Sequence, residues 1–440
     1  VVTAAMPASS TARLLVVLPG SPGREPVLRR LQEEVAPLVV VVPAQFTELC
    51  SWARPLCSDW ITFESAEDSD EANQRVWSAV SAWVKSQASC ARELLGCMTY
   101  DEWGIEMCAF LCEQLKLPGT PVKTIRQIRN KVTFRDVCAA AGIPVPRYRT
   151  VHNAEDLQGA LEMEWTWPLI LKPAQGAGSY YVRKVETPEE LLEVFPPMHE
   201  EFSTQGKFPA TDVAAGWCLE EFFEGDEVDV DGWAEWGKSG WVLVSDNKAA
   251  TSSSCCETGG TYPSQLPVHI IEGLERLTAQ VVQALPGLHS TFHFEAKVDV
   301  ATGAMMPIEL NCRTGGAECP CCVEKCSGVY LPVAAADLAL GRAPARPEKL
   351  RDVVAASINV LLPEAGTLTA CGPQPQLYEE PSFLQAQFFG KVGQKYRPNQ
   401  GSMSCVCWMA AVGADAAEAE ANLQKCMSLC SFEVKPDEAA

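Results

Sequence analysis

The sequence predicts a chain that combines α/β and α+β domains, and three observations lead to this prediction. Apolar runs alternate with helical patterns over residues 1–122, which is typical of a parallel sheet flanked by helices. Residues 123–345 contain hairpin-forming strands around a glycine-rich loop. Residues 346–440 combine short strands, separated by glycines, with one helix, which indicates a small α+β closing domain.

Composition excludes some classes of partner. The chain has 440 residues, 35 basic and 56 acidic side chains, and a formal net charge of −21. This acidic balance argues against binding to nucleic acids or anionic membranes, which needs clustered Lys and Arg. No apolar run approaches the ~20 residues that cross a bilayer. Small molecules are therefore the expected partners.

Cysteine usage and the first residues bear on location. The 20 cysteines are scattered through apolar patterns, whereas secreted disulfide scaffolds are shorter and denser in cysteine. We therefore expect buried, reduced thiols in a protein of the cytoplasm or of an organelle stroma or matrix, not a secreted one. Residues 1–13 are rich in Ser and Thr and free of acids, so they fit either a frayed end or the end of a transit peptide.

The elements follow in order along the chain. A helix is expected over Thr124–Ala141, with Gly142 at its C-cap, and 168–185 reads as strand, glycine loop and strand. A hairpin turn is expected at Gly237–Gly240, and Asp415 is expected to cap the last helix, which runs to about Cys430. The other expected strands are Leu14–Leu18, Leu38–Val42, Glu93–Tyr100, Trp217–Phe223, Glu227–Trp236, Gly240–Ser245, Thr291–Val300, Met306–Asn311 and Val353–Leu362. The other expected helices lie around Val27–Glu34, before Leu115 and over Ile270–Val281, and the acidic segment Glu64–Glu71 is expected to be a solvated loop or a helix start.

Three motifs carry chemistry. The loop Gln175–Ser179 has glycines that let backbone N–H groups approach an anion, and strands on both sides make it a flap. Glu295, Glu309 and Asn311 lie on neighbouring, partly buried strands and offer the hard oxygen ligands that Mg²⁺ prefers. Arg313 precedes two glycines and suits the capture of a carboxylate or phosphate. Taken alone, a turn with a surface arginine is the favoured reading of this motif, and a flexible hairpin is an equal reading of the glycine loop.

These motifs occur in one order: Lys131, Lys172 with its flap, an acidic strand end at Glu220–Gly225, then Glu295 and Glu309-Leu-Asn311. The ordered set resembles the ATP-grasp superfamily. The resemblance implies a Rossmann-like pre-ATP-grasp domain over residues 1–122, a two-lobed ATP-grasp domain over 123–345 and an associated C-terminal subdomain over 346–440.

The resemblance also implies roles for individual residues. Bound ATP and Mg²⁺, with Mn²⁺ as a substitute, are expected, and the metal ligands would be Glu295, Glu309 and Asn311. Arg313, Lys172 and Glu257 would be catalytic. The ATP-binding residues would be Lys131, Lys172, Gln175, Gly176, Gly178, Ser179, Glu220, Glu221, Phe222, Phe223, Glu227 and Ile308.

The segment CCETGGTYPSQLP, which contains Glu257, resembles the ExGxxxPS segment of L-amino-acid ligases and carnosine-synthase-like enzymes. It implies a ligase that joins a carboxylate to an amine through an acyl phosphate and releases ADP and phosphate. Amino acids would be its substrates, Glu257 would hold an ammonium group, and a homodimer is a common assembly among such enzymes. Cys255, Cys256 and Cys312 depart from the usual residues and leave the substrates open.

Three other interpretations stay open at this point. A bicarbonate-using or purine-pathway ligase would share the same activation step, and a regulatory module would bind the nucleotide without turnover. A thiol or metal sensor rests on the cysteine count alone. Cys319, Cys321, Cys322 and Cys326 are too tightly spaced for a regular zinc site and are read as small apolar residues. His152 and His289 are read as surface residues or as satisfied core residues.

Overall fold

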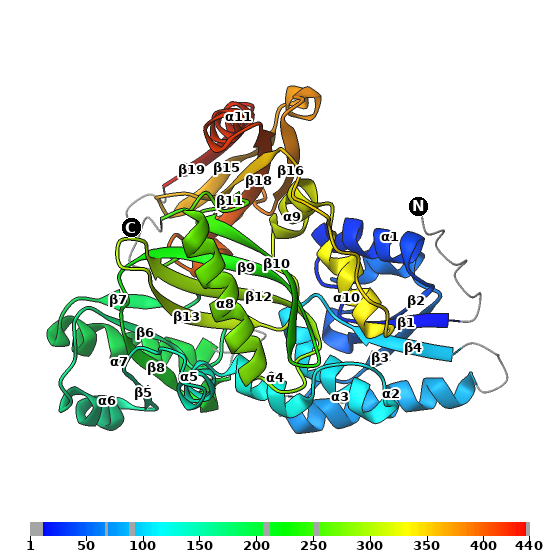
Figure 1. Ribbon diagram of the computed structural model, residues 1–440, viewed down its shortest axis with the longest axis horizontal. Coiled ribbons are helices and arrows are strands. Elements are labelled where there is room, and N and C mark those ends of the chain that lie inside the picture. Colours follow the sequence, from blue (N-terminus) through cyan, green and yellow to red (C-terminus); the bar gives the residue numbers. More distant parts are fainter. Residues whose placement is uncertain (1–11, 67–68, 88–92, 206–211, 250–254, 437–440) are drawn as a thin grey trace.

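The computed structural model describes residues 12–66, 69–87, 93–205, 212–249 and 255–436 (Figure 1). Most of the N-terminal segment that fits a transit peptide, and two residues of the acidic segment 64–71, lie outside these ranges. The described chain contains a parallel sheet, a small antiparallel lobe and a long antiparallel sheet that continues into the C-terminal part. This arrangement confirms the predicted α/β and α+β fold classes.

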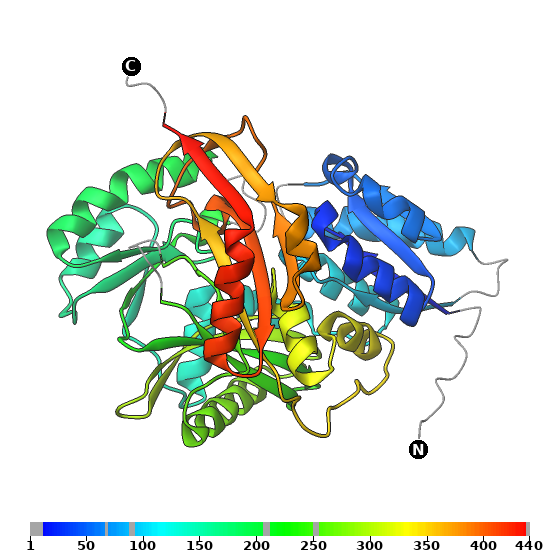
Figure 2. The same ribbon diagram turned by 90° about the horizontal axis from the view of Figure 1, so that it is seen from above.

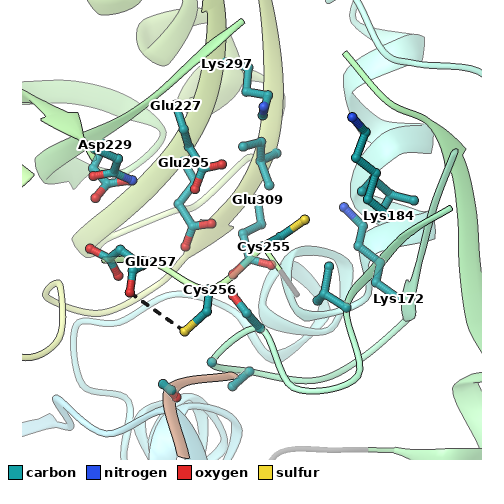
Figure 3. A pocket seen from close by; sticks show the side chains of 18 of the residues that line it. Lys172, Lys184, Glu227, Asp229, Cys255, Cys256, Glu257, Glu295, Lys297 and Glu309 are labelled. Atoms are coloured by element: carbon teal, nitrogen blue, oxygen red, sulfur yellow. Dashed lines mark hydrogen bonds between the residues drawn. The ribbon is translucent and has the colours of Figure 1, made fainter. Parts of the chain in front are cut away.

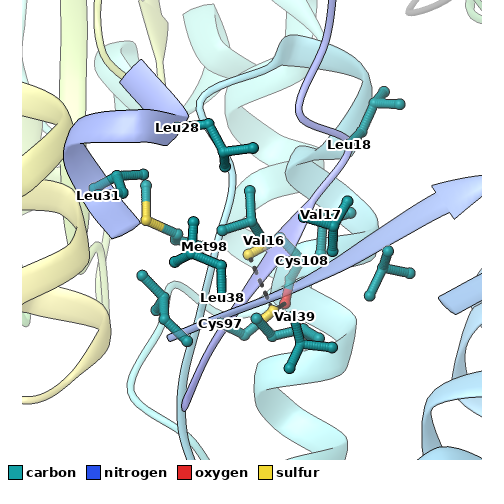
Figure 4. Packing of buried hydrophobic residues seen from close by; sticks show 14 of the residues in the cluster. Val16, Val17, Leu18, Leu28, Leu31, Leu38, Val39, Cys97, Met98 and Cys108 are labelled. Carbon is teal, nitrogen blue, oxygen red and sulfur yellow. Dashed lines mark hydrogen bonds between the residues drawn. The ribbon is translucent and has the colours of Figure 1, made fainter. Parts of the chain in front are cut away.

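The N-terminal domain is a parallel sheet in the order β3-β2-β1-β4. Strands β1 and β2 are buried along their described lengths, which explains the apolar runs Leu14–Leu18 and Leu38–Val42 (Figure 4). Strand β3 was not predicted, because its sequence DWITF mixes exposed and buried positions. The elements are β1 (Ala12–Val17), α1 (Glu25–Glu34), β2 (Leu38–Pro43), β3 (Asp59–Phe63), α2 (Ser69–Ser86), β4 (Glu93–Met98) and α3 (Ile105–Leu115).

The helix expected over Thr124–Ala141 is wrong as a single element. The structure has α4 (Val122–Arg129) and α5 (Lys131–Ala140), separated at Asn130. The Asn130 backbone is extended, and its side-chain oxygen accepts hydrogen bonds from the N–H groups of Val132 and Thr133. An asparagine that caps a helix N-terminus in this way ends one helix and begins another. The break orients Lys131 independently of α4.

A small lobe follows, with an antiparallel sheet in the order β5-β8-β6-β7. Its core packs Trp217 of β8 against Phe195 and Phe202 of α7. The predicted strand, glycine loop and strand correspond to β6, the loop and β7. The elements are β5 (Tyr148–Val151), α6 (Ala154–Leu161), β6 (Leu169–Pro173), β7 (Arg183–Val185), α7 (Pro188–Gln205) and β8 (Trp217–Glu221).

The long sheet has the order β13-β12-β9-β10-β11-β14-β18-β16. Helix α8 covers one face of β9 and β12, where Phe292, Phe294 and Val230 form the core (Figure 1). Because strand residues alternate between faces, His293 and Glu295 lie on the opposite face. The first elements of this part are β9 (Asp226–Glu235), β10 (Lys238–Asn247), β11 (Gly260–Tyr262), α8 (Val268–Ala284), β12 (Ser290–Asp299) and β13 (Ala304–Asn311).

The hairpin between β9 and β10 turns earlier than expected. Trp236 and Gly237 both have positive φ angles, of 55° and 78°, while Lys238 already pairs with Glu235 across the hairpin. Two consecutive residues with positive φ are typical of a tight two-residue turn. The expected turn at Gly237–Gly240 is therefore shifted, and Gly240 lies inside β10.

The C-terminal part contributes strands to the long sheet and also forms a small sheet of its own. Strands β14, β18 and β16 extend the long sheet, β17-β15-β19 form a second layer, and α11 packs beside them (Figure 2). Helix α10 packs back onto the N-terminal sheet. The elements are α9 (Cys319–Ser327), α10 (Leu331–Ala339), β14 (Val354–Leu361), β15 (Gly366–Pro373), β16 (Phe383–Phe388), β17 (Lys395–Tyr396), β18 (Cys405–Gly413), α11 (Ala416–Ser428) and β19 (Cys430–Lys435).

The described helices include none with the length and apolar character that a membrane span requires. The described cysteines are free thiols. Of the cysteines in α9, Cys319, Cys322 and Cys326 are buried in one apolar cluster, as expected for small apolar residues. No two of the α9 cysteines belong to a group of potential metal ligands among the described residues.

The N-cap of α11 gives a test of the fold. Asp415 accepts a hydrogen bond from the N–H of Glu418 at 2.9 Å. We expect Asp415→Ala to lower the free energy of unfolding of the C-terminal part by about 1 kcal/mol. Asp415→Asn should stay close to wild type, because asparagine caps equally well. Urea unfolding followed by circular dichroism measures both, and an equal loss in the two variants would contradict a capping role.

Candidate functional site

A cavity of about 1070 Å³ lies between the small lobe, the long sheet and the C-terminal part. Acidic side chains of the long sheet line one side, and Lys172 and Lys184 of the small lobe face them (Figure 3). Most of the predicted site residues line this cavity, and Gln175 and Asn311 are not among its lining residues. The predicted residues that line it are Lys131, Lys172, Gly176, Gly178, Ser179, Glu220, Glu221, Phe222, Phe223, Glu227, Glu257, Glu295, Ile308, Glu309 and Arg313.

The acidic wall follows from strand register. Glu295 of β12 pairs with Glu309 of β13 on one side and with Asp229 of β9 on the other. Paired residues on neighbouring strands point to the same face, so three carboxylates lie in a row across the sheet. Asp229 is 1% exposed, and Asn247 donates a hydrogen bond to it at 3.1 Å. The sequence analysis found Glu295 and Glu309 but missed Asp229, because strand order is not visible in the sequence.

Lys131 neutralises one carboxylate of this row. Its Nζ lies 2.8 Å from Glu309 Oε2, and Asn311 Nδ2 donates to Glu309 Oε1 at 3.0 Å. Burial alone would raise the pKa of Glu309, but Lys131 outweighs it and lowers the pKa to about 2. For Glu295, burial and the adjacent Glu309 raise the pKa well above its ordinary value. A divalent cation beside the pair would let both carboxylates ionise.

A second buried ion cluster joins the lobe to the long sheet. Glu220 of β8 accepts hydrogen bonds from Arg135 Nε at 3.0 Å and from Lys172 Nζ at 2.5 Å. Arg135 also donates to the carbonyl of Ile308 at 2.7 Å. Despite its burial, Glu220 has a pKa lowered to about 2 by these two cations. The Glu220 side chain is therefore engaged in this cluster, so only the backbone of Glu220 remains available for the expected adenine-reading role.

Arg135 was missed by the sequence analysis. It lies one turn after Lys131 on α5 and is 1% exposed. A buried arginine in a helix is rare unless it is paired, so its position on the apolar face of α5 was the available signal.

The glycine-rich loop is closed against the C-terminal part. Gly178 has φ of +65°, and its carbonyl accepts a hydrogen bond from the N–H of Ser402 at 2.8 Å. Gly401 has φ of +56°, and a Cβ at this position would lie 2.2 Å from the Gly178 carbonyl oxygen. Glycine is thus required at 401 for the loop to approach. Lys131 Nζ also contacts the carbonyl of Gly176, at 3.3 Å.

Phe222 lies between two lysines near the cavity mouth. Lys184 and Lys297 each place Nζ over its ring, at 4.4 and 4.3 Å from the centroid. Cation–π contacts of this kind hold the ring and keep both charges close to the cavity. Both lysines line the cavity, and neither was singled out from the sequence.

Glu257 stands at the acidic end of the cavity (Figure 3). Its side chain is accessible from the cavity, not packed in the core. Enclosure by the cavity walls and the nearby Asp229 and Glu318 raise the pKa of Glu257. His293 is close by, and its Nδ1 lies 2.9 Å from Asp231 Oδ1. This end of the cavity therefore favours a positively charged group.

Arg313 connects the cavity to the N-terminal domain. Its Nε donates to Glu102 Oε2 at 3.0 Å, and its Nη1 donates to the Thr314 carbonyl at 3.0 Å. Glu102 begins the short 3₁₀ helix Glu102–Gly104, directly after β4. Arg313 is thus held by two acceptors while it lines the cavity, which fixes the direction of its guanidinium.

The residues present fit a nucleotide with a divalent cation. The paired Glu295 and Glu309 supply hard oxygen donors, which suit Mg²⁺ or Mn²⁺. Lys131 and Lys172 are buried cations at the cavity wall, and the closed loop places backbone groups of Gly176 and Gly178 beside them. A site that binds phosphates needs both a divalent cation and positively charged or N–H donors.

Comparison with known proteins agrees with this geometry. The family model for the ATP-grasp domain matches residues 165–322. The match runs from just before β6 to the first turn of α9, so this part of the chain is similar to an ATP-grasp domain. Lys131 lies before the match and Lys172 lies inside it.

Three curated relatives align with parts of the chain. Human carnosine synthase 1 is 27% identical over 318 residues, or 68% of this chain and 36% of the relative. The alanine–anticapsin ligase of Bacillus subtilis strain 168 is 31% identical over 131 residues, or 30% and 28% of the two chains. An uncharacterised protein, y4rH, of Sinorhizobium fredii is 39% identical over 97 residues, or 22% and 19%. The chain thus spans about a third or less of these relatives.

Solved structures share the fold over nearly the whole chain. The L-amino acid ligase of Bacillus licheniformis superposes with a TM-score of 0.79 at 18% identity, covering 97% of this chain and all of that one. A biotin carboxylase of Campylobacter jejuni, solved as a β-γ-ATP complex, has a TM-score of 0.67 at 16% identity and covers 96% and 92%. These likenesses concern the fold, including the C-terminal part beyond residue 345.

The Glu220 cluster predicts a pH dependence of stability. The folded pKa of about 2 lies below the ordinary 4.5, so this stabilisation is complete above about pH 4.5 and is lost as the pH falls toward 2. Glu220→Gln should cost about 3 to 5 kcal/mol at pH 7, because it leaves two buried cations unpaired. The substitution should also reduce the fall in the free energy of unfolding between about pH 4.5 and pH 2.

Urea unfolding at a series of pH values measures this effect. Glu224→Gln is the matched control, because the Glu224 side chain is 76% exposed. If Glu220→Gln lost stability at low pH in the same way as the wild type, Glu220 would not be the group responsible for this pH dependence.

Proposed function

We propose that the chain is an ATP-dependent ligase that joins a carboxylate to an amine through an acyl phosphate, with amino acids as substrates. One observation carries the proposal. Three fixed cations, Lys131, Lys172 and Arg313, and the paired carboxylates Glu295 and Glu309 line one cavity that the glycine-rich loop closes. The named activities of the relatives support it.

In the first step, an oxygen of the substrate carboxylate bonds to the γ-phosphorus of ATP, and the bond from that phosphorus to ADP breaks. Mg²⁺ bound by Glu295 and Glu309 would neutralise phosphate charge. Lys131 and Lys172 would bind phosphate oxygens from the two sides of the loop, and Arg313 would hold the transferred phosphoryl group. Positioning and charge stabilisation suffice for such a transfer, so no side-chain nucleophile is required.

In the second step, the amine attacks the acyl carbon, phosphate leaves, and the nitrogen loses a proton to give the amide. Glu257 and Asp229 favour an ammonium group at the acidic end of the cavity. Pairing with the ammonium would ionise Glu257 and hold the nitrogen near the acyl group, and the ammonium would pass one proton to the Glu257 carboxylate or to solvent before the free amine attacks. The closed loop keeps water from the acyl phosphate.

The competing readings differ in substrate and turnover. A bicarbonate-using ligase would need no ammonium subsite, whereas the carboxylates of Glu257 and its acidic neighbours suit one. A regulatory nucleotide-binding module would have no need of the paired carboxylates Glu295 and Glu309 together with three cations. Both readings are tested by the same assay, with bicarbonate replacing the amino acids in one arm.

One prediction of the proposed function concerns turnover of ATP. We expect Mg-ATP with a pair of amino acids, drawn from a pooled set, to release ADP and phosphate, and Glu309→Ala to lower the rate by about 10²-fold or more. The matched control is Glu272→Ala on α8, whose side chain is 58% exposed. Amide product is identified by mass spectrometry. Release that is unaffected by Glu309→Ala, or that needs bicarbonate alone, would overturn the proposal.

A second prediction separates catalysis from nucleotide binding. Arg313→Lys keeps the charge but loses the planar set of donors. We expect kcat to fall by about 10²-fold while the Kd for ATP stays within about threefold. Isothermal titration with ATP and steady-state kinetics measure the two quantities. A parallel loss of both would place Arg313 in ground-state nucleotide binding.

A further inference from the structure

Three buried cysteines outside the cavity gather beneath the N-terminal sheet. Cys97 lies on β4, and Cys108 and Cys112 lie on α3. Their sulfur atoms all lie within 4.8 Å of one another. The residues are 3%, 9% and 3% exposed, respectively. Figure 4 shows Cys97 and Cys108 with their sulfurs directed toward each other below β1.

The sulfur spacing suits a metal ion better than a disulfide. Zinc–sulfur bonds of about 2.3 Å in a tetrahedral site place two sulfurs about 3.8 Å apart. Cys97 Sγ and Cys108 Sγ are 3.7 Å apart. A disulfide requires a sulfur separation of about 2.05 Å. Cys108 and Cys112 are four residues apart on one helix, so both face the strand that carries Cys97.

A histidine, His289, lines the same space, although it lies outside the 4.8 Å group of sulfurs. A cavity of about 50 Å³ is lined by the three cysteines and by His289. The His289 Nε2 lies 3.2 Å from the Leu338 carbonyl, which can only accept, so Nε2 carries the hydrogen and Nδ1 the lone pair. Nδ1 is buried and has no hydrogen-bond partner among the described residues. The reading of His289 as a satisfied core residue is therefore wrong for this atom.

Two contacts orient the His289 ring. Trp236, in the β9–β10 turn, stacks on its ring at 4.1 Å with an interplanar angle of 11°. Metal-binding histidines commonly donate their second ring N–H to a backbone carbonyl, as His289 does to Leu338. A buried nitrogen lone pair without a donor is costly, and a metal ion removes that cost.

We propose that Cys97, Cys108 and Cys112 bind one Zn²⁺ ion, and that His289, which lies outside their 4.8 Å group, moves closer to supply Nδ1 as the fourth ligand. Binding converts three thiols to thiolates and releases three protons to solvent; no electron is transferred. Three sulfur ligands and one imidazole suit Zn²⁺ and exclude Mg²⁺, which prefers oxygen. The ion would tie the N-terminal domain to the start of β12, because His289 precedes Ser290.

The test measures metal content and ligand type. Wild-type protein, purified with reductant, is incubated with ZnCl₂ in excess Mg²⁺, desalted and analysed by inductively coupled plasma mass spectrometry. We expect about one Zn²⁺ per chain in wild type, almost none in Cys108→Ala, and at least about a tenfold weaker affinity in His289→Ala. The matched control is Cys138→Ala on α5, a fully buried helical cysteine outside the group, which should keep its zinc.

A second measurement covers the case in which Cys108→Ala does not fold. Wild type is treated with a thiol-alkylating reagent with and without a zinc chelator, and modified cysteines are mapped by mass spectrometry. We expect Cys97, Cys108 and Cys112 to react only after chelation. Replacement by Co²⁺ should give thiolate charge-transfer absorption.

Three results would overturn the proposal: wild type that retains no zinc, alkylation of the three cysteines that ignores the chelator, or a disulfide between Cys97 and Cys108. An unchanged zinc affinity in His289→Ala would exclude the histidine ligand. Because the readout is the metal itself, these outcomes are independent of the ligase assay.

Discussion

Buried carboxylates on the two lobes are each neutralised by a cation from the same helix, and the cavity depends on this arrangement. Lys131 and Arg135 lie one turn apart on α5. Lys131 pairs with Glu309 of the long sheet, and Arg135 pairs with Glu220 of the small lobe. Helix α5 therefore joins the lobes through charge, and the capping of Asn130 at its start fixes where both cations point.

The same arrangement sets the polarity of the cavity. Glu295 and Asp229 have no lysine at bonding distance among the described residues, and His293 lies 3.6 and 3.9 Å from them. Their burial raises the pKa of both carboxylates, so they ionise more readily once a cation binds beside them. A metal ion and an ammonium group are the natural counter-charges for such a wall. The lysines opposite, Lys172 and Lys184, suit phosphates instead (Figure 3). One cavity thus presents lysines that suit phosphates opposite carboxylates that suit cations.

Local patterns in the sequence predicted much of this. Most strands and the capping aspartate of α11 follow from alternation, glycine placement and capping patterns, and the order of the motifs located part of the cavity lining. Features that depend on strand order did not follow, such as Asp229 beside Glu295. The break at Asn130 was hidden because Ile125, Ile128 and Val132 keep a helical period across it. The grouping of Cys97 with Cys108 was equally hidden, since it depends on how α3 packs on β4.

Gln175 and Asn311 illustrate the limit of motif matching. Their neighbours line the cavity, yet their own side chains are not part of its lining. Asn311 instead steadies Glu309 through its amide. A motif fixes a position on a strand, whereas hydrogen bonding decides what the side chain does there.

The contact between Gly401 and the glycine-rich loop links two segments more than 200 residues apart in the chain. Any side chain at 401 would collide with the loop backbone. The position of the loop and that of the C-terminal part are therefore structurally coupled. A chimera that exchanges the C-terminal part for that of a relative would retain the closed loop only if the donor also has glycine at this position.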